Sequence, residues 1–346
     1  MYGCRGSAAN RGNGTEKRSS DVVRVWGLEP QRREAREPKS RMSADSIIPA
    51  YLICRKKCVN ISKKSEKRTV MRIVVNDDID LEQTAESGQC FRWEQTGDRE
   101  YRIIHKENCL YISQEDSGEL LLDCREEEYE TVWRDYFDLD TDYREIRRLI
   151  DPESDPFLHM AAKEEQGIRI LRQDPWEIAV SFIISQNRSI PIIRRSVAQL
   201  CRLAGERYTD KRGEAYHSFP GPEAVLSMTD EELAKCRLGY REKYVLAAAR
   251  AANDGVFLPE RFERLPDMEL LRELGTLYGV GPKVASCIAL YGFHRLDAFP
   301  VDTWIRKALE NEYPEGFPFD RYRPYNGVFQ QYVFAFYRRA AACKSS

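Results

Sequence analysis

The chain has 346 residues, enough for two domains or three small ones, and its 42% hydrophobic and 32% charged residues are typical of a globular protein. No apolar run approaches the roughly 18 residues of a membrane span, and the ten cysteines are scattered without a Cys-x-x-Cys pair, which argues against a disulfide framework. The net charge of −2 hides an asymmetry: 17 of the 54 Lys and Arg but only 7 of the 56 Asp and Glu fall in residues 1–70, so residues 71–346 carry −12.

Residues 1–70 are rich in Gly, Ser, Asn, Arg and Lys and show little periodicity, which predicts a disordered basic leader. Three explanations stay open. The leader is an arm that steers the protein to DNA, a targeting segment, or an extension that is not native, since Met71 has the place of a natural start. Because the rest of the chain is acidic and DNA-binding domains are usually basic, charge alone counts against a nucleic-acid partner.

Short runs typical of strands, separated by Gly, Asn, Asp and Ser, follow from Met71 to about Cys124. They read MRIVV, SGQCFRWEQ, EYRIIH, CLYIS and ELLLDC. From Glu126 the apolar period is helical, and we expect it to stay helical to the C-terminus. The fold class is therefore α+β, with a small antiparallel β-rich domain over 71–165 and a larger all-helical domain over 166–346.

Capping residues mark several helices of the second domain. Asp174 precedes a proline and the apolar run WEIAVSFIIS, which predicts an N-cap followed by proline at the first helical position. Thr229 and Glu232 have the spacing of a capping box. Further helices are expected in REKYVLAAARAAN, over 268–278, and over about 327–342.

The stretch LYGVGPKVASCIALYGFHRLDAFPVD, residues 277–302, predicts a helix-hairpin-helix motif at 268–293. One helix ends near Tyr278, a tight turn runs through Gly279 and Gly281, and the next helix begins at Pro282. Such a turn presents free backbone N–H groups at a helix N-terminus, which suits a phosphate.

Two polar residues of this stretch are candidates for chemistry. Lys283 lies one residue inside a helix N-terminus, where the macrodipole disfavours a cation and favours the neutral amine that attacks carbon. The alternative is a surface lysine that touches a phosphate. Asp302 has the place of an N-cap, and capping alone would explain it. The other interpretation is a carboxylate that stabilises developing positive charge or moves protons.

The hairpin, the lysine and the Pro-Val-Asp that follows resemble the helix-hairpin-helix DNA glycosylase superfamily. Other motifs resemble the 8-oxoguanine DNA glycosylase family in particular, and the match spans about residues 71–340. These motifs are SGQCFRW at 87–93, GIRILRQDPWE at 167–177, SFIISQN at 181–187, LGYREKYV at 238–245 and GVFQQYVF at 327–334.

The resemblance implies catalytic and base-recognition roles. Lys283 matches the nucleophile that attacks C1′ and leaves a Schiff base, after which β-elimination nicks the strand, and Asp302 matches the essential aspartate. Such an enzyme must flip the damaged base out of the duplex. Four further residues match the site for that base. Gly88 matches the carbonyl that accepts N7–H of 8-oxoguanine, Cys287 and Phe334 match the two stacking faces, and Gln330 matches the reader of the Watson–Crick edge.

The resemblance also implies residues that contact the opposite strand. Asn187 and Arg241 match contacts to the orphaned cytosine, and Tyr240 matches a wedge into the gap. Gly279 and Gly281 match the turn that anchors the DNA backbone. The chain departs from human-type members at Arg188, where they carry a second asparagine, and at Ile192, where they carry a second cytosine-reading arginine. We therefore expect a weaker preference for cytosine opposite the lesion.

Rival interpretations are a monofunctional or different-lesion glycosylase and a non-catalytic DNA-binding protein with this hairpin. Endonuclease-III-like members carry a cysteine cluster after the hairpin, where this chain has only Cys287 and Cys343. The expected partner is double-stranded DNA containing 8-oxoguanine, bound by a monomer with no membrane association. No cofactor and no catalytic metal are expected, although a structural monovalent cation could bind at the hairpin. The expected compartment is the cytoplasm or nucleoid if the source is prokaryotic, with the nucleus as the alternative.

Overall fold

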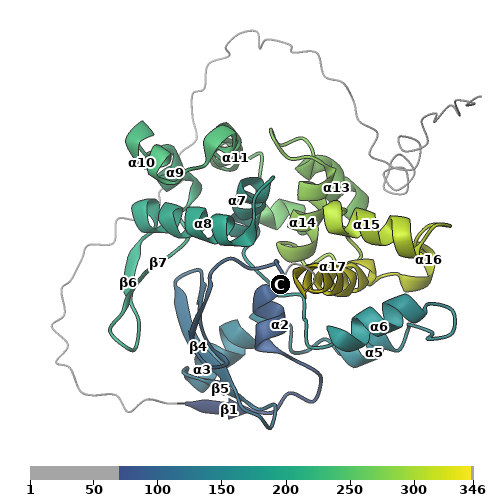
Figure 1. Ribbon diagram of the computed structural model, residues 1–346. Coiled ribbons are helices and arrows are strands. Elements are labelled where there is room, and N and C mark those ends of the chain that lie inside the picture. The colour runs from purple at the N-terminus through teal and green to yellow at the C-terminus, as the bar shows by residue number, and fades with distance from the viewer. Residues whose placement is uncertain (1–69, 344–346) are drawn as a thin grey trace, which may run out of the picture. The chain divides into compact units, whose positions relative to one another are not determined.

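A five-stranded antiparallel sheet opens the part of the chain that the computed structural model describes, residues 70–343 (Figure 1). The predicted leader lies outside these residues. The strand order is β1-β5-β4-β3-β2. The strands are β1 (Met71–Ile73), β2 (Trp93–Gly97), β3 (Glu100–His105), β4 (Asn108–Gln114) and β5 (Leu120–Leu122).

Apolar side chains on one face of this sheet form a core with several short helical segments. Ile103, Leu110 and Leu120 are fully buried there, beside Trp133 and residues of the helix that precedes β2. The segments that cover the sheet are α2 (Leu81–Glu86), α3 (Glu126–Glu128), a π-helical turn η1 (Tyr129–Trp133) and α4 (Arg134–Tyr136). The sheet thus has one buried face, as is usual for antiparallel sheets.

The run SGQCFRWEQ is only partly a strand, contrary to the prediction. A helix, α2, precedes it, and the strand begins at Trp93. Asp80 starts this helix by accepting a hydrogen bond from the Gln83 N–H at 2.9 Å. Residues 87–92 form a largely buried loop, because its backbone groups pair with side chains of distant segments instead of with a neighbouring strand.

Helices make up most of the remaining structure. They are α5 (Tyr143–Arg147), α6 (Pro156–Glu164), α7 (Pro175–Ser185), α8 (Ile190–Ala204), α9 (Pro222–Leu226), α10 (Asp230–Lys235), the 3₁₀ turn η2 (Gly239–Arg241), α11 (Glu242–Asn253), α12 (Pro259–Phe262), α13 (Asp267–Leu274), α14 (Pro282–Tyr291), α15 (Thr303–Glu312), α16 (Phe319–Tyr322) and α17 (Asn326–Cys343).

Helix α7 is the most deeply enclosed of these helices, and it contacts α8, α11 and α14 (Figure 1). Its residues 177–184 are all buried, as expected for a helix that is apolar on every side. Asp174 caps it through the Glu177 N–H at 2.8 Å, as predicted. The capping box predicted at Thr229 and Glu232 is also present, at the start of α10.

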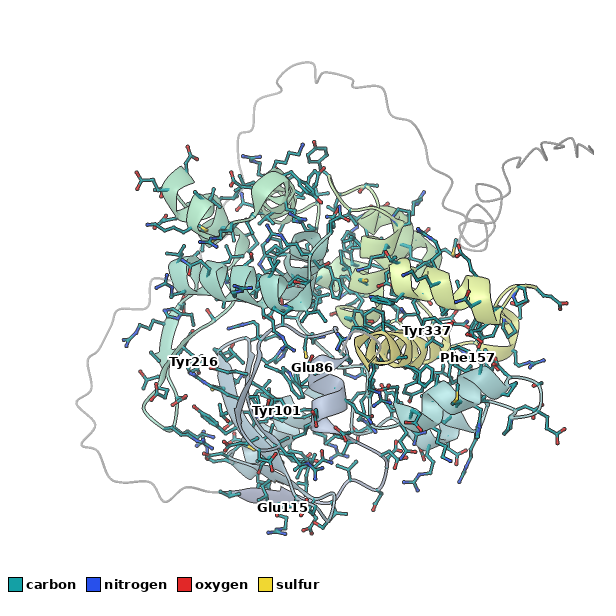
Figure 2. The ribbon with its side chains drawn as sticks, viewed as in Figure 1. Glu86, Tyr101, Glu115, Phe157, Tyr216 and Tyr337 are labelled. Atoms are coloured by element: carbon teal, nitrogen blue, oxygen red, sulfur yellow. The ribbon has the colours of Figure 1, made fainter. Side chains whose placement is uncertain are left out.

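Helix α17 packs on α6, α15 and α16 near the C-terminal end of the described chain. Phe157 of α6 meets Tyr337 of α17 edge to face, with ring centroids 5.8 Å apart (Figure 2). The helix is the one predicted over 327–342, longer by one residue at each end.

The fold class is confirmed, but the prediction of helix from Glu126 to the C-terminus is wrong at one hairpin. Strands β6 (Arg207–Thr209) and β7 (Ala215–His217) pair antiparallel, with Tyr208 opposite Tyr216. Tyr216, which Figure 2 labels, packs in one apolar cluster with Tyr111 of the main sheet. Two three-residue strands are too short to show a clear period of two, so the sequence pattern could not separate them from a loop.

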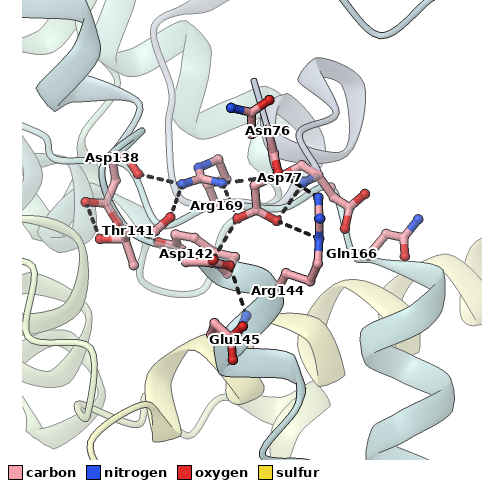
Figure 3. Close-up of polar contacts among 12 residues, drawn as sticks. Asn76, Asp77, Asp138, Thr141, Asp142, Arg144, Glu145, Gln166 and Arg169 are labelled. Carbon is pink, nitrogen blue, oxygen red and sulfur yellow. Dashed lines mark hydrogen bonds and ion pairs between the residues drawn. The ribbon is translucent and has the colours of Figure 1, made fainter. Parts of the chain in front are cut away.

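A buried arginine ties three loops together at the base of the sheet (Figure 3). Arg169, with 1% of its surface exposed, forms an ion pair with Asp77 at 3.0 Å and donates to the carbonyls of Phe137, Asp138 and Thr141. Its guanidinium also lies 4.3 Å from the ring centroid of Tyr143. A fifth hydrogen bond, to the Asp78 carbonyl at 3.4 Å, leaves every donor of this buried charge paired with protein, which is what a buried charge requires.

No helix between residues 70 and 343 is long and apolar enough to cross a membrane.

Candidate active site

The predicted helix-hairpin-helix is formed by α13, a turn over residues 275–281, and α14. Gly279 has a φ of +86°, and a Cβ at this position would lie 2.2 Å from the ring of Tyr244, so only glycine fits. Gly281 is the N-cap of α14, and a Cβ there would meet open space. The two glycines therefore have different roles: Gly279 allows close packing, and Gly281 keeps the helix N-terminus uncovered.

Lys283 is the second residue of α14 and is half-buried. Its Nζ lies 5.1 Å from the ring centroid of Phe182, which comes from α7. Cys287, one turn further along α14, is buried. Burial raises the pKa of the Cys287 thiol, while the charge of Lys283 and a hydrogen bond to it oppose that shift. The lysine therefore lies beside a neutral thiol and an aromatic ring at a partly exposed position.

Asp302 caps α15, as predicted, by accepting a hydrogen bond from the Ile305 N–H at 2.8 Å. Burial raises the pKa of the Cys287 thiol and of the Tyr291 hydroxyl. The negative charge of Asp302 adds to both shifts. Capping leaves the other carboxylate oxygen available. The charges of Asp302, at the start of α15, and of Lys283, on α14, thus both act on Cys287.

Two of the predicted base-recognition residues meet at the loop after α2. Gly88 has a φ of +80°, and a Cβ there would lie 3.2 Å from Cε1 of Phe334. Phe334 is half-buried on α17, with the guanidinium of Arg338 5.9 Å from its ring centroid. Gly88 is therefore in contact with the aromatic side chain predicted to stack on the flipped base.

Gln330 lies one turn before Phe334 on α17 and is buried. Its Nε2 donates to the carbonyl of Pro300 at 3.0 Å, while its Oε1 has no hydrogen-bond partner among the described residues. Because the carbonyl can only accept, the amide orientation is fixed, with the oxygen left free. This oxygen is therefore available to accept a hydrogen bond from a ligand.

The residues predicted to face the opposite strand form a second group. Asn187 has a φ of +51° and donates from Nδ2 to the Tyr240 hydroxyl at 3.2 Å. Arg241 is buried, lies 4.2 Å from the Tyr240 ring centroid, and donates from Nε to the carbonyl of Gln186 at 2.7 Å. The structure thus brings Asn187, Tyr240 and Arg241 together, although Arg241 is occupied by carbonyls of the protein.

Two further residues of this group make contacts that the sequence did not predict. Arg188 donates to the carbonyls of Arg237 and Leu238, which lie just before Tyr240. Gln186 donates from Nε2 to the carbonyl of Gly279 at 3.1 Å, and so links this group to the hairpin. Their partners are backbone carbonyls of distant segments, which leave no signal in the sequence.

Exposed tyrosines connect the two regions. Tyr240 and Tyr278 are 48% and 58% exposed, and both meet the ring of Tyr244 edge to face, with centroids 6.0 and 5.1 Å away. The ammonium of Lys243 lies 5.2 Å from the Tyr244 centroid. Exposed aromatic side chains thus form a continuous surface beside the hairpin.

A cavity of about 470 Å³ lies elsewhere, at the N-terminal end of α7, where Trp176 and Phe257 contribute to its walls. None of the predicted site residues lines it.

Comparisons with known proteins match nearly all of the described chain. Residues 72–178 match the model of the 8-oxoguanine DNA glycosylase N-terminal domain, and residues 180–313 match that of the HhH-GPD superfamily of base excision DNA repair proteins. An N-glycosylase/DNA lyase of Saccharomyces cerevisiae is 31% identical over 258 residues, which is 67% of this chain and 68% of that protein. A probable N-glycosylase/DNA lyase of Methanothermobacter thermautotrophicus is 30% identical over 272 residues, or 70% and 85%.

A solved structure is also similar. The 8-oxoguanine glycosylase/lyase of Clostridium acetobutylicum, in complex with double-stranded DNA containing cytosine opposite the lesion, is 33% identical and superimposes with a TM-score of 0.74. The match covers 80% of this chain and 98% of that one.

Proposed function

This chain belongs to the 8-oxoguanine N-glycosylase/DNA lyase family of base-excision repair enzymes, and we propose that Lys283 is the nucleophile with which it excises 8-oxoguanine from duplex DNA and nicks the strand. The observation that supports this most directly is the arrangement around α14. The charges of Lys283 and Asp302 both act on Cys287, and Gln330 donates from Nε2 to the carbonyl of Pro300, two residues before Asp302, while its Oε1 stays free.

The proposed chemistry begins at the sugar. The Nζ of Lys283 attacks C1′ as the bond from C1′ to N9 of the base breaks, and the base leaves with its bonding electrons and takes up a proton. Asp302 stabilises the positive charge that develops on the sugar and accepts a proton from the lysine. The bond from C1′ to O4′ then breaks, with O4′ taking up a proton, and C1′ and Nζ form the Schiff base. The Schiff base loses a proton from C2′, and the bond from C3′ to the 3′ phosphate oxygen breaks as the phosphate leaves with its bonding electrons. This last step nicks the strand.

Recognition of the base follows from two acceptors. The free Oε1 of Gln330 needs a donor, and guanine-type bases present N1–H and N2–H₂ on the Watson–Crick edge, whereas adenine presents a bare N1. The Gly88 carbonyl would accept N7–H, which 8-oxoguanine has and guanine lacks. Phe334 and Cys287 would stack on the two faces of the base. Together these groups select an oxidised guanine.

Anchoring of the duplex is assigned to the hairpin and the tyrosine surface. The open N-terminus of α14 at Gly281 suits a phosphate, and we propose that the enzyme acts as a monomer without membrane association. The chemistry as written needs no cofactor. A monovalent cation could bind hairpin carbonyls, although the Gly279 carbonyl already accepts from Gln186.

We propose that the enzyme has a weak preference for cytosine opposite the lesion. Arg241 is occupied by the carbonyl of Gln186, and Ile192 offers no donor where human-type relatives carry an arginine. Excision should therefore differ little between duplexes that place cytosine and adenine opposite the lesion. Single-turnover rates on the two duplexes test this, and a strong preference for cytosine would contradict it.

Borohydride trapping on 8-oxoguanine duplex DNA tests the assignment of the nucleophile. We expect a covalent adduct with the wild type, no adduct with Lys283→Gln, and an undiminished adduct with Lys307→Gln. Lys307 is a matched control, because it is an exposed lysine that also lies over an aromatic ring, 5.0 Å from the centroid of Trp304. Base release without an adduct would indicate a monofunctional glycosylase, and binding alone would indicate a non-catalytic protein.

A further inference from the structure

The two residues beside Gly88 are buried, and both of their carbonyls are engaged by glutamine side chains. Gln331 donates from Nε2 to the Ser87 carbonyl at 2.6 Å, and Gln173 donates from Nε2 to the Gln89 carbonyl at 3.0 Å. Within residues 70–343 the Gly88 carbonyl accepts no hydrogen bond, and Gly88 is the partly exposed member of the three. The peptide groups on either side are thus held, while the carbonyl between them is free.

The Gln89 side chain joins the same loop to the segment 169–171. Its Oε1 accepts from the Leu171 N–H at 2.8 Å, and its Nε2 donates to the Arg169 carbonyl at 2.9 Å. A single buried amide therefore pairs with the backbone of the segment 169–171, much as a neighbouring strand would. The segment GIRILRQDPWE thus holds the segment SGQCFRW in place.

The Gln331 side chain links this loop to the helix that carries Lys283. Its Oε1 accepts a hydrogen bond from the hydroxyl of Tyr291, at the end of α14. Burial raises the pKa of Tyr291 well above its ordinary value, so the hydroxyl keeps its proton and can donate. The Tyr291 ring stacks on Phe182 with centroids 5.3 Å apart, and Phe182 is the ring that faces the Lys283 ammonium.

We propose that Tyr291 and Gln331 are positioning residues that fix the Gly88 carbonyl relative to Lys283. The group that recognises the lesion and the group that attacks C1′ then keep a constant distance and orientation. The inference rests on the proposed function of Gly88 and Lys283. The relay runs from Tyr291 on α14 through Gln331 on α17 to the Ser87 carbonyl, and all three residues are buried.

Discrimination at Gly88 depends on one hydrogen bond, and that explains why its carbonyl needs such support. Oxidation adds a proton at N7 of the base. A carbonyl oxygen at the correct point therefore accepts a hydrogen bond from 8-oxoguanine, whereas in guanine the same oxygen faces N7, which is itself an acceptor. Hydrogen bonds weaken steeply as distance and angle depart from their ideal values. A loop free to shift by about an ångström would lose the distinction while the lysine stayed competent.

The test compares two activities of the same protein, excision of 8-oxoguanine and cleavage of a preformed abasic site, which needs Lys283 but no base recognition. Gln331→Met keeps the volume and removes both hydrogen bonds of the relay. We expect the ratio of excision to abasic-site cleavage to fall about tenfold, the effect of one lost hydrogen bond, with abasic-site cleavage within about twofold of wild type. Tyr291→Phe removes one oxygen and should lower the same ratio to a smaller extent.

Gln114→Met is the matched control. Gln114 is also a buried glutamine with two backbone partners, the Leu81 N–H and the Ile79 carbonyl, but it lies in β4 and makes no hydrogen bond to residues 87–89. It should lower the thermal midpoint as Gln331→Met does and leave the ratio unchanged. If Gln331→Met does not fold, Tyr291→Phe carries the test.

An equal fall of both activities in the relay variants, or an unchanged ratio, would overturn the positioning role. A second check is the double variant Tyr291→Phe/Gln331→Met, whose ratio should equal that of Gln331→Met because the two residues act in series. A wild-type protein that cleaves abasic sites and leaves 8-oxoguanine intact would instead refute the proposed lesion, and the relay would fall with it.

Discussion

Substitution by alanine should strongly destabilise the protein at one glycine of the hairpin, Gly279, and leave its stability nearly unchanged at the other, Gly281. In Gly279→Ala the new Cβ would lie 2.2, 2.4 and 2.7 Å from three ring atoms of Tyr244, where carbon atoms normally stay about 3.5–4.0 Å apart. The ring would have to retreat by more than about 1 Å, and it is packed against Tyr240 and Tyr278. Gly281→Ala places its Cβ in open space at a φ of −90°.

The magnitude follows from two separate effects. Overpacking of this kind typically costs about 1–3 kcal/mol, and an L-residue at a φ of +86° costs a further 1–2 kcal/mol or so. Gly279→Ala should therefore lower the free energy of unfolding by about 2–5 kcal/mol. For Gly281→Ala, the poorer N-cap and the reduced entropy of the unfolded chain roughly cancel, so the change should stay within about 1 kcal/mol.

Urea denaturation at constant slope measures both changes, and duplex binding provides the second readout. Gly281→Ala should weaken binding of duplex DNA without loss of stability, because its methyl group covers the N–H groups offered to a phosphate. The double variant Gly279→Ala/Tyr244→Ala should be more stable than the sum of the single changes predicts, by about 1–3 kcal/mol, since the clash is gone and only the backbone strain remains. Additive effects, or equal destabilisation at both glycines, would refute the reasoning.

Three further outcomes are expected. Asp302→Asn keeps an oxygen that can cap the Ile305 N–H but removes the charge, so single-turnover excision should fall about 10²–10⁴-fold at nearly unchanged duplex affinity, and unchanged turnover would refute the role. Gly88→Ala introduces a Cβ 3.2 Å from Phe334 at a φ of +80°, so 8-oxoguanine excision should fall far more than abasic-site cleavage; equal losses would place Gly88 outside base recognition. Burial alone would raise the pKa of Asp138, but hydrogen bonding and charge from His294, with Arg172, hold it below its ordinary value of 3.8. The stability this gives is present above pH 3.8 and is lost as pH falls through the lowered pKa, so Asp138→Asn should flatten the acid limb of thermal unfolding curves, and an unchanged limb would contradict this.

Features that depend on neighbouring residues in the sequence could be predicted. The caps at Asp174 and Thr229 and the hairpin turn at Gly279 each follow from local chemistry, because the partner atoms lie within three or four residues. The meeting of Gly88 with Phe334 could be predicted only through the resemblance, since the contact joins residues far apart in the chain.

Features that depend on tertiary approach could not be predicted. Gln331 and Arg188 act on backbone carbonyls of distant segments, and every residue supplies such a carbonyl, so no residue type marks the partner. The helix α2 could not be predicted, because its six residues make fewer than two helical turns and show no clear apolar period. The hairpin of β6 and β7 gains its stability from contact with Tyr111, which lies almost a hundred positions earlier.

The enclosed helix α7 decides how this protein can be divided or recombined. The border between the two matched family segments, at residues 178–180, falls inside this helix, which runs from Pro175 to Ser185. A cut at that border would break a helix whose central residues are all buried, and neither half would keep an intact core. Chimeras with relatives should therefore fail when the crossover follows the border between the segments.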